Sequence, residues 1–461
     1  MQSEYDVIVI GSGVSGLCAT IASLQSGAKT LLLEKQSEED AIPNWQFTVA
    51  GAVRVEPGDE ADEAFDECMQ ESRGLADPSL IRTVLDNSKA SLEWLGQLGL
   101  AWAPGTDRFG SGVRRRVWRT PLEWPMVSKT LSVQAQKLGA HIQYETPMVK
   151  ISKDSHWTVH ACKGEKELTY RAKAVVLAAG GFQRNDAMMR QYLGPEADGT
   201  IATARGGNEG DGIRAIREIG AQIVDMDQFL LTIIHKPKMD ITTSGIEGCY
   251  RLHWFYHAIV VDKKGKRFID ESVGVESGVT EYMARAMIGL DKAAAYLVVD
   301  SNGNDQAVCD NPALAVFDGR FQGDTIREVA KQADIDPDEL ETTVSEFNSG
   351  VKNGRYEGNP PKRSIAAPVD KSPFYIYPMA VSVMFTNGGG KINTSAEILA
   401  DDDSPIKGIY ATGDMAAGFF YHEFGMPVMR MQRNITFGRI AGANAATHAL
   451  NLENLTPAVN L

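Results

Sequence analysis

Three glycines near the amino terminus have the spacing of a loop that holds a phosphate. They lie in Gly11-Ser-Gly13-Val-Ser-Gly16, directly after the apolar run 5–10. Gly11 permits a tight turn, Gly13 lets the backbone approach a pyrophosphate, and Gly16 lets the next helix pack closely on the strand. The amino terminus of that helix offers N–H groups and partial positive charge to an anion. The segment therefore predicts a dinucleotide site.

A carboxylate follows this loop at the expected distance. Residues 17–25 are expected to form a helix that ends at Gly27, and residues 30–34 a second strand that ends at Glu34. An acid roughly 20 residues after the glycine loop can accept hydrogen bonds from both ribose hydroxyls. Strand, helix and acid together make the pattern far more specific than the glycines alone.

Two later segments favour FAD over NAD. Residues 173–182 read as a buried strand that enters the Gly180-Gly181 turn, and residues 408–414 as another strand that ends at Gly413 and Asp414. Asp414 is expected to bind a ribityl hydroxyl, and the strand expected at 141–149 to present its backbone to the adenine. No second glycine loop has the strand and helix context of a separate NAD(P)H site.

Composition excludes several classes of partner. The net charge of −14 argues against nucleic acid. The five cysteines lie far apart without a CxxC pair, so no metal site is expected. No signal peptide is evident, and no apolar run reaches the roughly 18 residues that cross a membrane. The protein is therefore expected to be cytoplasmic. A length of 461 residues predicts two domains.

At this point the chain resembles the fumarate reductase/succinate dehydrogenase flavoprotein family. Beside the first glycine loop, the resemblance is carried by residues 178–182, 207–221, 265–271, 387–393, 411–414 and 437–442. It implies an α/β fold in which a Rossmann-like FAD-binding domain carries an inserted α+β capping domain. The expected bounds are 1–228 and 371–461 for the two parts of the FAD-binding domain and 229–370 for the capping domain. Within the latter, apolar residues recur at helical spacing over 325–331 and 336–347, flanked by aspartate caps.

The resemblance also implies which residues contact the cofactor. Beside Gly11, Gly13, Gly16 and Glu34, the expected contacts are Ser12, Val14, Ser15, Lys35, Ala50, Gly51, Val149, Ala179, Gly180, Gly181, Asn185, Asp211, Gly413, Asp414 and Met429. Relatives with covalent FAD carry an early histidine, whereas residues 46–52 contain none. Noncovalent FAD is therefore expected.

The reaction implied by the resemblance is oxidation or reduction of a C–C bond beside an electron-withdrawing group. One carbon exchanges hydride with the flavin, and its neighbour exchanges a proton with a protein acid or base. The arginines of fumarate chemistry are absent after Glu271 and in 301–305, and Phe385 replaces the substrate histidine. Fumarate reduction is therefore not expected.

Residues 418–425 are similar to a segment of tricarballylate dehydrogenase and 3-ketosteroid dehydrogenase relatives. The first hypothesis is therefore dehydrogenation of a small cyclic or steroid-like ketone or carboxylic acid. The alternatives are an ene-reductase of an enone or unsaturated acid and a flavin-binding homologue without catalysis. The partner is a small-molecule substrate, while the electron acceptor and the oligomeric state stay open.

Candidates for acid–base chemistry are tyrosines and histidines, which suit proton transfer. They are Tyr421 and His422 near the carboxyl terminus and Tyr250, Tyr256 and His257 in the capping domain. The alternative for each is a packing role. Arg430, with Arg433, is a candidate for binding a substrate carboxylate, and the alternative is an ion pair with a nearby acid. Arg114, Arg115, Arg116 and Arg119 form a basic cluster that either recruits an anion or is simply solvated.

Overall fold

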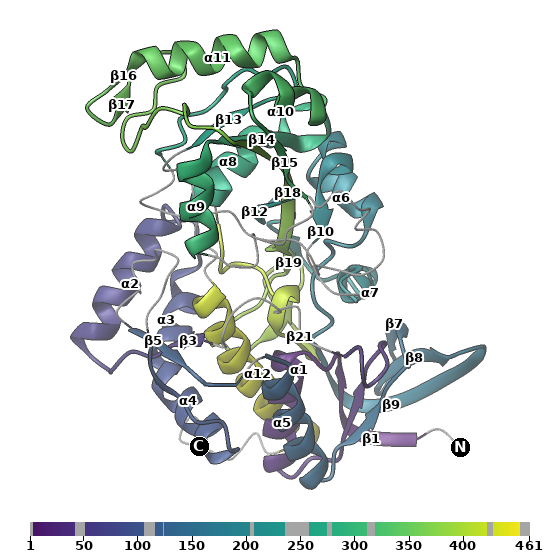
Figure 1. Cartoon of the computed structure of the whole chain (residues 1–461). Helices are drawn as coiled ribbons and strands as arrows, with labels where there is room; N and C mark the ends of the chain where they lie inside the picture. Colours follow the sequence, from purple (N-terminus) through teal and green to yellow (C-terminus); the bar gives the residue numbers. More distant parts are fainter. Residues whose placement is uncertain are drawn as a thin grey trace. The chain divides into compact units, whose positions relative to one another are not determined.

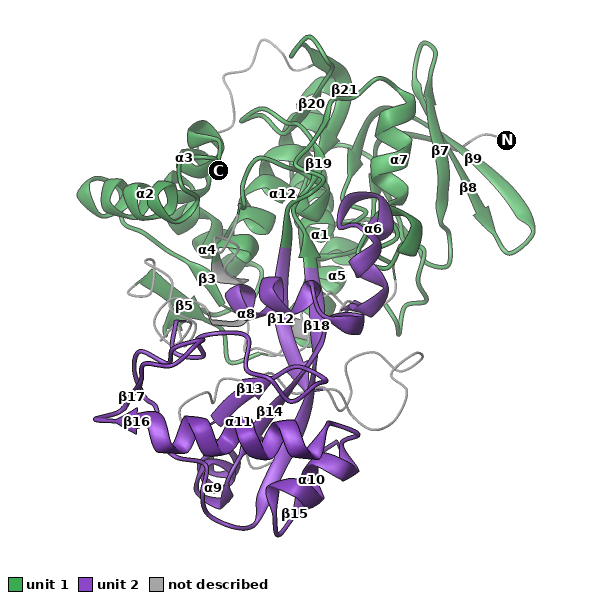
Figure 2. Ribbon diagram, turned by 90° about the horizontal axis from the view of Figure 1, so that it is seen from above, with its two compact units in different colours: residues 1–188, 204–229, 385–461 green, residues 189–203, 230–384 purple. Residues whose placement is uncertain are grey.

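The computed structural model describes residues 3–41, 51–105, 116–122, 124–202, 207–235, 258–273, 279–310, 319–421 and 427–451. The chain divides into two compact units, coloured green and purple in Figure 2. Unit 1 comprises residues 1–188, 204–229 and 385–461, and unit 2 comprises residues 189–203 and 230–384. Most of unit 2 is thus a single insertion along the chain. The functions expected for 1–228, 229–370 and 371–461 stay predictions.

An eight-stranded sheet forms the centre of unit 1 (Figure 1). Its main path runs through β20 (Glu397–Leu399), β21 (Pro405–Ala411), β9 (Lys166–Leu177), β1 (Ser3–Ile10), β2 (Thr30–Leu33) and β6 (His141–Gln143). All of these strands except β20 run parallel to their neighbours. Val7, Ile8 and Val9 of β1 are fully buried, as in a strand covered on both faces. The expected α/β class is confirmed.

An antiparallel extension leaves this sheet through β9. It consists of β7 (Met148–Lys153) and β8 (Trp157–Lys163), with β8 paired to the first half of β9. The single strand expected at 141–149 is wrong, because β6 ends at Gln143 and β7 begins at Met148. Glu145, with φ 54°, has left-handed backbone, and Pro147 lacks an N–H for pairing. These two residues separate the strands.

Two helices of unit 1 pack unusually closely. They are α1 (Val14–Gln25), which begins before the expected Leu17, and α12 (Pro427–Ala449). A Cβ on Gly438 would lie 2.6 Å from the carbonyl oxygen of Ser15, and one on Gly442 would lie 2.1 Å from that of Ala19. These two glycines therefore let the helix backbones touch, which fixes α12 against the helix that follows the glycine loop.

The remaining elements of unit 1 surround the sheet. They are α2 (Asp59–Glu71), α3 (Pro78–Asp86), α4 (Ser88–Gln97), α5 (Trp124–Lys137), α7 (Asp211–Glu218), and the small strands β3 (Gly51–Val53), β4 (Ala103–Pro104), β5 (Val117–Arg119), β11 (Ile223–Val224) and β19 (Gly389–Gly390). The helix α6 (Asp186–Tyr192) belongs in part to each unit.

Unit 2 is built on a six-stranded sheet around one long strand, β18 (Phe374–Thr386). The other strands are β10 (Ile201–Ala202), β12 (Phe229–His235), β13 (Ala258–Val261), β14 (Ala294–Val299) and β15 (Phe321–Gly323). Antiparallel pairing joins β13 to β14 and β14 to β18. The helices are α8 (Val279–Ile288), α9 (Ser301–Asp310), α10 (Ile326–Gln332) and α11 (Pro337–Gly350), and β16 (Val351–Lys352) pairs with β17 (Arg355–Tyr356).

Both helices expected near 325–347 are confirmed. The Asp336 side chain caps α11 by accepting from the N–H groups of Asp338 and Glu339 at 3.0 and 3.1 Å. The cap of α10 is Thr325 rather than an aspartate, since its hydroxyl accepts from the N–H of Glu328 at 3.1 Å. Buried residues of these helices, including Phe347, join the core formed with the sheet of unit 2.

Candidate active site

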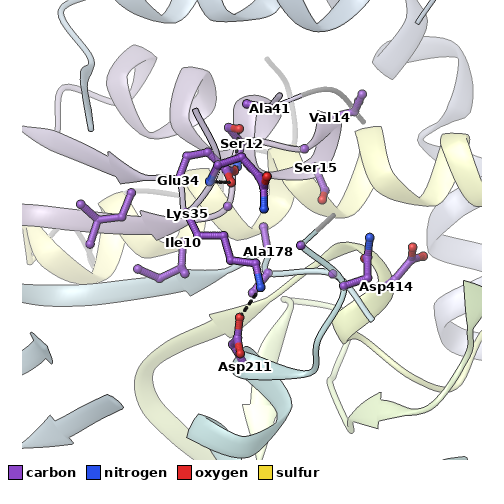
Figure 3. A pocket seen from close by; sticks show the side chains of 18 of the residues that line it. Ile10, Ser12, Val14, Ser15, Glu34, Lys35, Ala41, Ala178, Asp211 and Asp414 are labelled. Carbon is purple, nitrogen blue, oxygen red and sulfur yellow. Dashed lines mark hydrogen bonds and ion pairs between the residues drawn. The ribbon is translucent and has the colours of Figure 1, made fainter. Parts of the chain in front are cut away.

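A cleft of unit 1 lies where the parallel strands β1, β2 and β9 end (Figure 3). Its empty space, open solvent included, is about 1000 Å³. The lining residues are Ile10, Gly11, Ser12, Gly13, Val14, Ser15, Leu33, Glu34, Lys35, Gln36, Asp40, Ala41, Thr146, Met148, Ala178, Ala179, Gly180, Gly207, Asn208, Asp211, Asp414, Met431 and Asn434. Ligands of open α/β sheets bind at the carboxyl ends of the strands.

The glycine loop has the geometry of a pyrophosphate cradle. Gly11 has φ 101°, and a Cβ there would lie 2.4 Å from the carbonyl oxygen of Ala178. A Cβ on Gly16 would lie 1.9 Å from the carbonyl oxygen of Gly11, whereas one on Gly13 would meet nothing within 4 Å. The helix α1 starts after Gly13 without a side-chain cap or an acidic residue in its first turn. Its first N–H groups therefore face the cleft as anion donors.

Glu34 is fixed at the cleft by the loop itself. Its Oε2 accepts from the N–H of Ser12 at 2.8 Å and from the Ser12 hydroxyl at 2.7 Å. Its Oε1 accepts from the N–H of Gln36 at 2.8 Å. Each carboxylate oxygen has about two acceptor sites, so Oε1 keeps one free for a ribose hydroxyl while Oε2 is already saturated by Ser12. The bond from Ser12 to Glu34 was not expected from the sequence.

Ion pairs connect Lys35, which follows β2, to the acidic residues at the start of α7. Lys35 Nζ lies 2.6 Å from Asp211 Oδ2 and 2.9 Å from Glu209 Oε2. Figure 3 shows Lys35 pointing toward Asp211. Both Lys35 and Asp211 line the cleft, and each is already neutralised by its neighbour. Their contact with the cofactor stays a prediction.

The Gly180-Gly181 turn is held by a residue that the sequence did not single out. Asn208 Oδ1 accepts from the N–H of Gly181 at 3.2 Å, and a Cβ on Gly180 would lie 2.4 Å from the same oxygen. Asn208 also lines the cleft. Asn208 lies in the 207–221 motif that carried the family resemblance, and this position could have identified it as a site residue from the sequence. Asn185 donates to the carbonyl of Glu209 at 2.9 Å and so supports the loop from outside the lining.

Asp414 lies at the cleft with its carboxylate already in use. Its Oδ1 accepts from Arg430 Nη1 at 2.7 Å and from Arg433 Nη2 at 2.6 Å. Burial favours a higher pKa for Asp414, but the two guanidinium groups outweigh it and hold the pKa below its ordinary value. The binding of a ribityl hydroxyl by the remaining oxygen stays a prediction.

The two arginines do not stand ready for a substrate carboxylate. Arg430 is 0% exposed and Arg433 is 1% exposed. The rings of Phe385 and Phe420 lie 4.3 and 4.4 Å from the Arg430 guanidinium carbon. The role expected for Arg430 as a substrate-binding residue disagrees with this structure, because the side chain is buried and forms an ion pair with Asp414. The alternative, an ion pair within the flavin domain, is what the structure contains.

Tyr421 forms a pair with a carboxylate at a turn. Its hydroxyl donates to Asp225 Oδ2 at 2.5 Å, and the N–H of Gly418 donates to the same oxygen at 3.2 Å. Asp225 has φ 59°, in the left-handed region that aspartate adopts more readily than most residues other than glycine. Burial raises the pKa of Asp225. Burial and the Asp225 carboxylate raise the pKa of Tyr421, so the phenol is protonated at neutral pH.

Several expected site residues do not line the cleft. They are the cofactor candidates Gly16, Gly51, Val149, Gly181, Asn185, Gly413 and Met429 and the catalytic candidates Tyr421 and Arg430. Val149 is 64% exposed, and its neighbour Met148 lines the cleft instead. Met429 is buried, while Met431 and Asn434 of the same helix reach the lining. Alternation along β7 and the rotation of α12 decide which neighbours face the cleft, and neither was fixed by the sequence.

Other expected residues lie outside the described ranges. These are Ala50, Tyr250, Tyr256, His257 and His422, and the same holds for Arg114 and Arg115 of the basic cluster. Arg116 is buried and forms ion pairs with Glu60, Glu63 and Glu67 of α2. This arginine therefore has a structural partner and is not a free docking charge.

Two absences can be stated for the part of the chain that the structure describes. No group of three or more His, Cys, Asp or Glu side chains there could hold a metal ion. Within the same ranges, no helix has both the length and the apolar character needed to span a bilayer. The expected cytoplasmic location stays a prediction.

The residues of the cleft fit FAD. Gly11 and Gly16 leave no room for a Cβ, Gly13 leaves open space for a pyrophosphate, and Glu34 is fixed where an acceptor for ribose hydroxyls is needed. Bound FAD would therefore be held by the loop, the start of α1 and Glu34. Noncovalent binding stays a prediction.

Comparison with known proteins places these features in a family. The sequence profile of the family described as FAD binding domain matches residues 6–423. The urocanate reductase of Eggerthella lenta is 28% identical over 97% of this chain and 76% of the relative. The NADH:fumarate oxidoreductase of Klebsiella pneumoniae is also 28% identical, and the chain spans only 48% of that protein.

Solved structures agree with the sequence comparison. The open conformation of a flavocytochrome c3 fumarate reductase is 25% identical with a TM-score of 0.79, over 97% of this chain and 79% of that one. The 3-ketosteroid delta1-dehydrogenase of Sterolibacterium denitrificans is 19% identical with a TM-score of 0.77, over 97% and 100%. The second likeness concerns the fold alone. The chain belongs to the FAD binding domain family and is an FAD-dependent oxidoreductase.

Proposed function

We propose that this protein reduces a carbon–carbon double bond conjugated to a carboxylate, with FAD as the hydride carrier. The observation that carries the proposal is the likeness to urocanate reductase along 97% of the chain. The relatives named as fumarate reductases support the same reductive direction. Dehydrogenation, which the sequence alone placed first, is the reverse of this step and becomes the second candidate.

The substrate class follows from what the chain lacks. By resemblance, fumarate reductases use arginines and histidines to hold the substrate and to donate the proton, and the expected arginines are missing after Glu271 and in 301–305. Glu271 itself is fully buried in a two-pronged ion pair with Arg267, whose Nη2 lies 2.6 Å from Glu271 Oε2. We therefore propose an unsaturated monocarboxylic acid rather than a dicarboxylate, and the likeness to urocanate reductase favours an aromatic group on its β-carbon.

Tyr421 is the proton donor that the described residues support best. When bound, the flavin supplies a hydride, and the protein must supply a proton to the neighbouring carbon. The Tyr421 phenol is protonated at neutral pH and so holds a proton to give, while burial and the Asp225 carboxylate raise its pKa and make it a weaker acid than an ordinary tyrosine. Asp225 accepts the hydrogen bond of the phenol at 2.5 Å and so fixes its orientation.

A steady-state assay tests the proposal. Purified holoprotein receives electrons from a reduced viologen dye and is offered cinnamate, urocanate, fumarate, cyclohexenone and an androstenone. We expect turnover with the arylacrylates, and little with fumarate. Turnover confined to the two ketones would move the substrate class back to the cyclic ketones. Turnover with none of the five would contradict the proposal.

A further inference from the structure

Two buried arginines of α12 share one carboxylate at the edge of the flavin cleft. Arg430 Nη1 and Arg433 Nη2 donate to the same oxygen, Oδ1 of Asp414. In the described ranges, no other carboxylate forms an ion pair with either arginine. Burial lowers the pKa of Arg433 to about 10, which still leaves it charged at neutral pH. Two positive charges thus face one negative charge, and the cluster keeps a net charge of about +1.

Among the described residues, the surroundings of the cluster bring dipoles but no second carboxylate. Arg430 donates to Asn387 Oδ1 and packs against the faces of Phe385 and Phe420. Arg433 donates to Asn434 Oδ1 at 3.0 Å and to the carbonyl of Ala416 at 3.4 Å. All of these groups carry partial charges only. Among the described residues, neither Arg430 Nε nor Asn387 Nδ2 has an acceptor, although both atoms are buried. A buried charge without full compensation costs stability. The arrangement is therefore not explained by folding alone.

The cluster lies directly behind the lining of the cleft. Asp414 lines the cleft, and Met431 and Asn434 from the same helix turn as the arginines line it too. In a medium of low dielectric constant the field of a charge extends further than in water. Charge near the reactive ring of a flavin is one of the means by which a protein tunes its electronics. Reduction places negative charge on that ring, so a nearby positive charge favours the reduced form.

We propose that Arg430 and Arg433 raise the reduction potential of the bound FAD by stabilising its anionic reduced form. They act through the field of the Asp414 cluster, without contact with substrate, and so are tuning residues rather than catalytic ones. The proposal rests on FAD binding and not on the substrate proposed above. If this protein acts on a different substrate, the proposal about the reduction potential is unaffected.

Neutral single variants test the proposal without leaving Asp414 unpaired. In R433M the carboxylate keeps Arg430, and in R430M it keeps Arg433, so the net charge of the cluster falls to zero in each. We expect the reduction potential of bound FAD, measured by equilibration with a redox dye, to fall in both variants. The expected change is at least tenfold in the two-electron equilibrium constant, or about 30 mV.

R439M is the matched control. Arg439 lies on the same helix and packs over Trp94 at 5.1 Å, and it is not an ion-pair partner of Asp414. Its removal should leave the potential at the wild-type value. Potentials of R430M and R433M equal to wild type, with FAD bound, would overturn the proposal. So would an equal fall in R439M, because the change would then reflect helix packing.

Sulfite gives a second readout that the wild-type holoprotein can supply. The sulfur lone pair of sulfite forms a bond to N5 of oxidised flavin, and the ring takes up the negative charge. We expect sulfite to bleach the visible flavin absorbance of wild type, with at least tenfold weaker binding in R430M and R433M. If both variants lose FAD, wild type decides: a flavin that excess sulfite does not bleach would overturn the proposal.

Discussion

Adding one methyl group at Gly13 should weaken FAD binding without affecting folding. A Cβ at Gly13 meets no protein atom within 4 Å, and its φ of −59° is accessible to alanine. Gly13→Ala should therefore change the free energy of unfolding of the apoprotein by no more than about 0.5 kcal/mol. The methyl group would, however, occupy the space that a pyrophosphate needs. Overpacking of this kind costs about 1–3 kcal/mol, which corresponds to a loss of FAD affinity of about 5- to 150-fold.

Gly16→Ala is the opposite case. Its Cβ would lie 1.9 Å from the carbonyl oxygen of Gly11, so the backbone of the loop must move. We expect a lower unfolding midpoint of the apoprotein as well as a loss of FAD. The assay is a titration of each apoprotein with FAD, followed by flavin fluorescence, beside thermal unfolding without FAD. A Gly13→Ala protein that binds FAD as wild type does, or that is destabilised as much as Gly16→Ala, would refute the reasoning.

Three further predictions follow from individual side chains. Glu34→Gln places an amide donor against the donors of Ser12; FAD affinity should fall at least tenfold, for a cost of about 1.5–3 kcal/mol, and unchanged binding by calorimetry would contradict the ribose role. Tyr421→Phe should lower kcat by about 10²- to 10⁴-fold with little change in KM. The control is Tyr170→Phe, which removes a hydroxyl bonded to Gln143 and should keep both constants. Equal losses in the two variants would assign Tyr421 a packing role. Burial lowers the pKa of His235 from 6.5 to about 3, so below about pH 6.5 the unfolded chain binds a proton that the fold excludes. The free energy of unfolding should fall as pH drops from 6.5 toward 3, by up to about 1.4 kcal/mol per pH unit from this group. His235→Gln should flatten that slope in urea unfolding. An unchanged slope would contradict the lowered pKa of His235.

The cofactor loop could be predicted from the sequence because its physics is local. Gly11, Gly13 and Gly16 lie within one turn and one helix start, and Glu34 follows at the length of a single helix and strand. The amino-terminal caps of α11 and α10 are local in the same sense. An aspartate cap was predicted for both helices, and Thr325 caps α10 instead.

The side-chain partners of the site could not be predicted, because they depend on distant segments meeting. The pair of Asp225 with Tyr421 joins residues 196 positions apart. The rotation of α12 about its axis turned Arg430 toward Asp414 rather than toward the cleft. The packing of α12 against α1, through Gly438 and Gly442, fixes which of its side chains face the flavin site.

Anaerobic mixing of the reduced holoprotein with an arylacrylate tests the central claim most directly. The account predicts that the oxidised flavin absorbance returns in a single turnover, with one double bond reduced for each flavin. The rate should fall in Tyr421→Phe while the spectrum of the starting enzyme stays the same. A flavin that stays reduced with every unsaturated acid, but is bleached from its oxidised form by a saturated acid or ketone, would contradict the reductase assignment and establish the dehydrogenase instead.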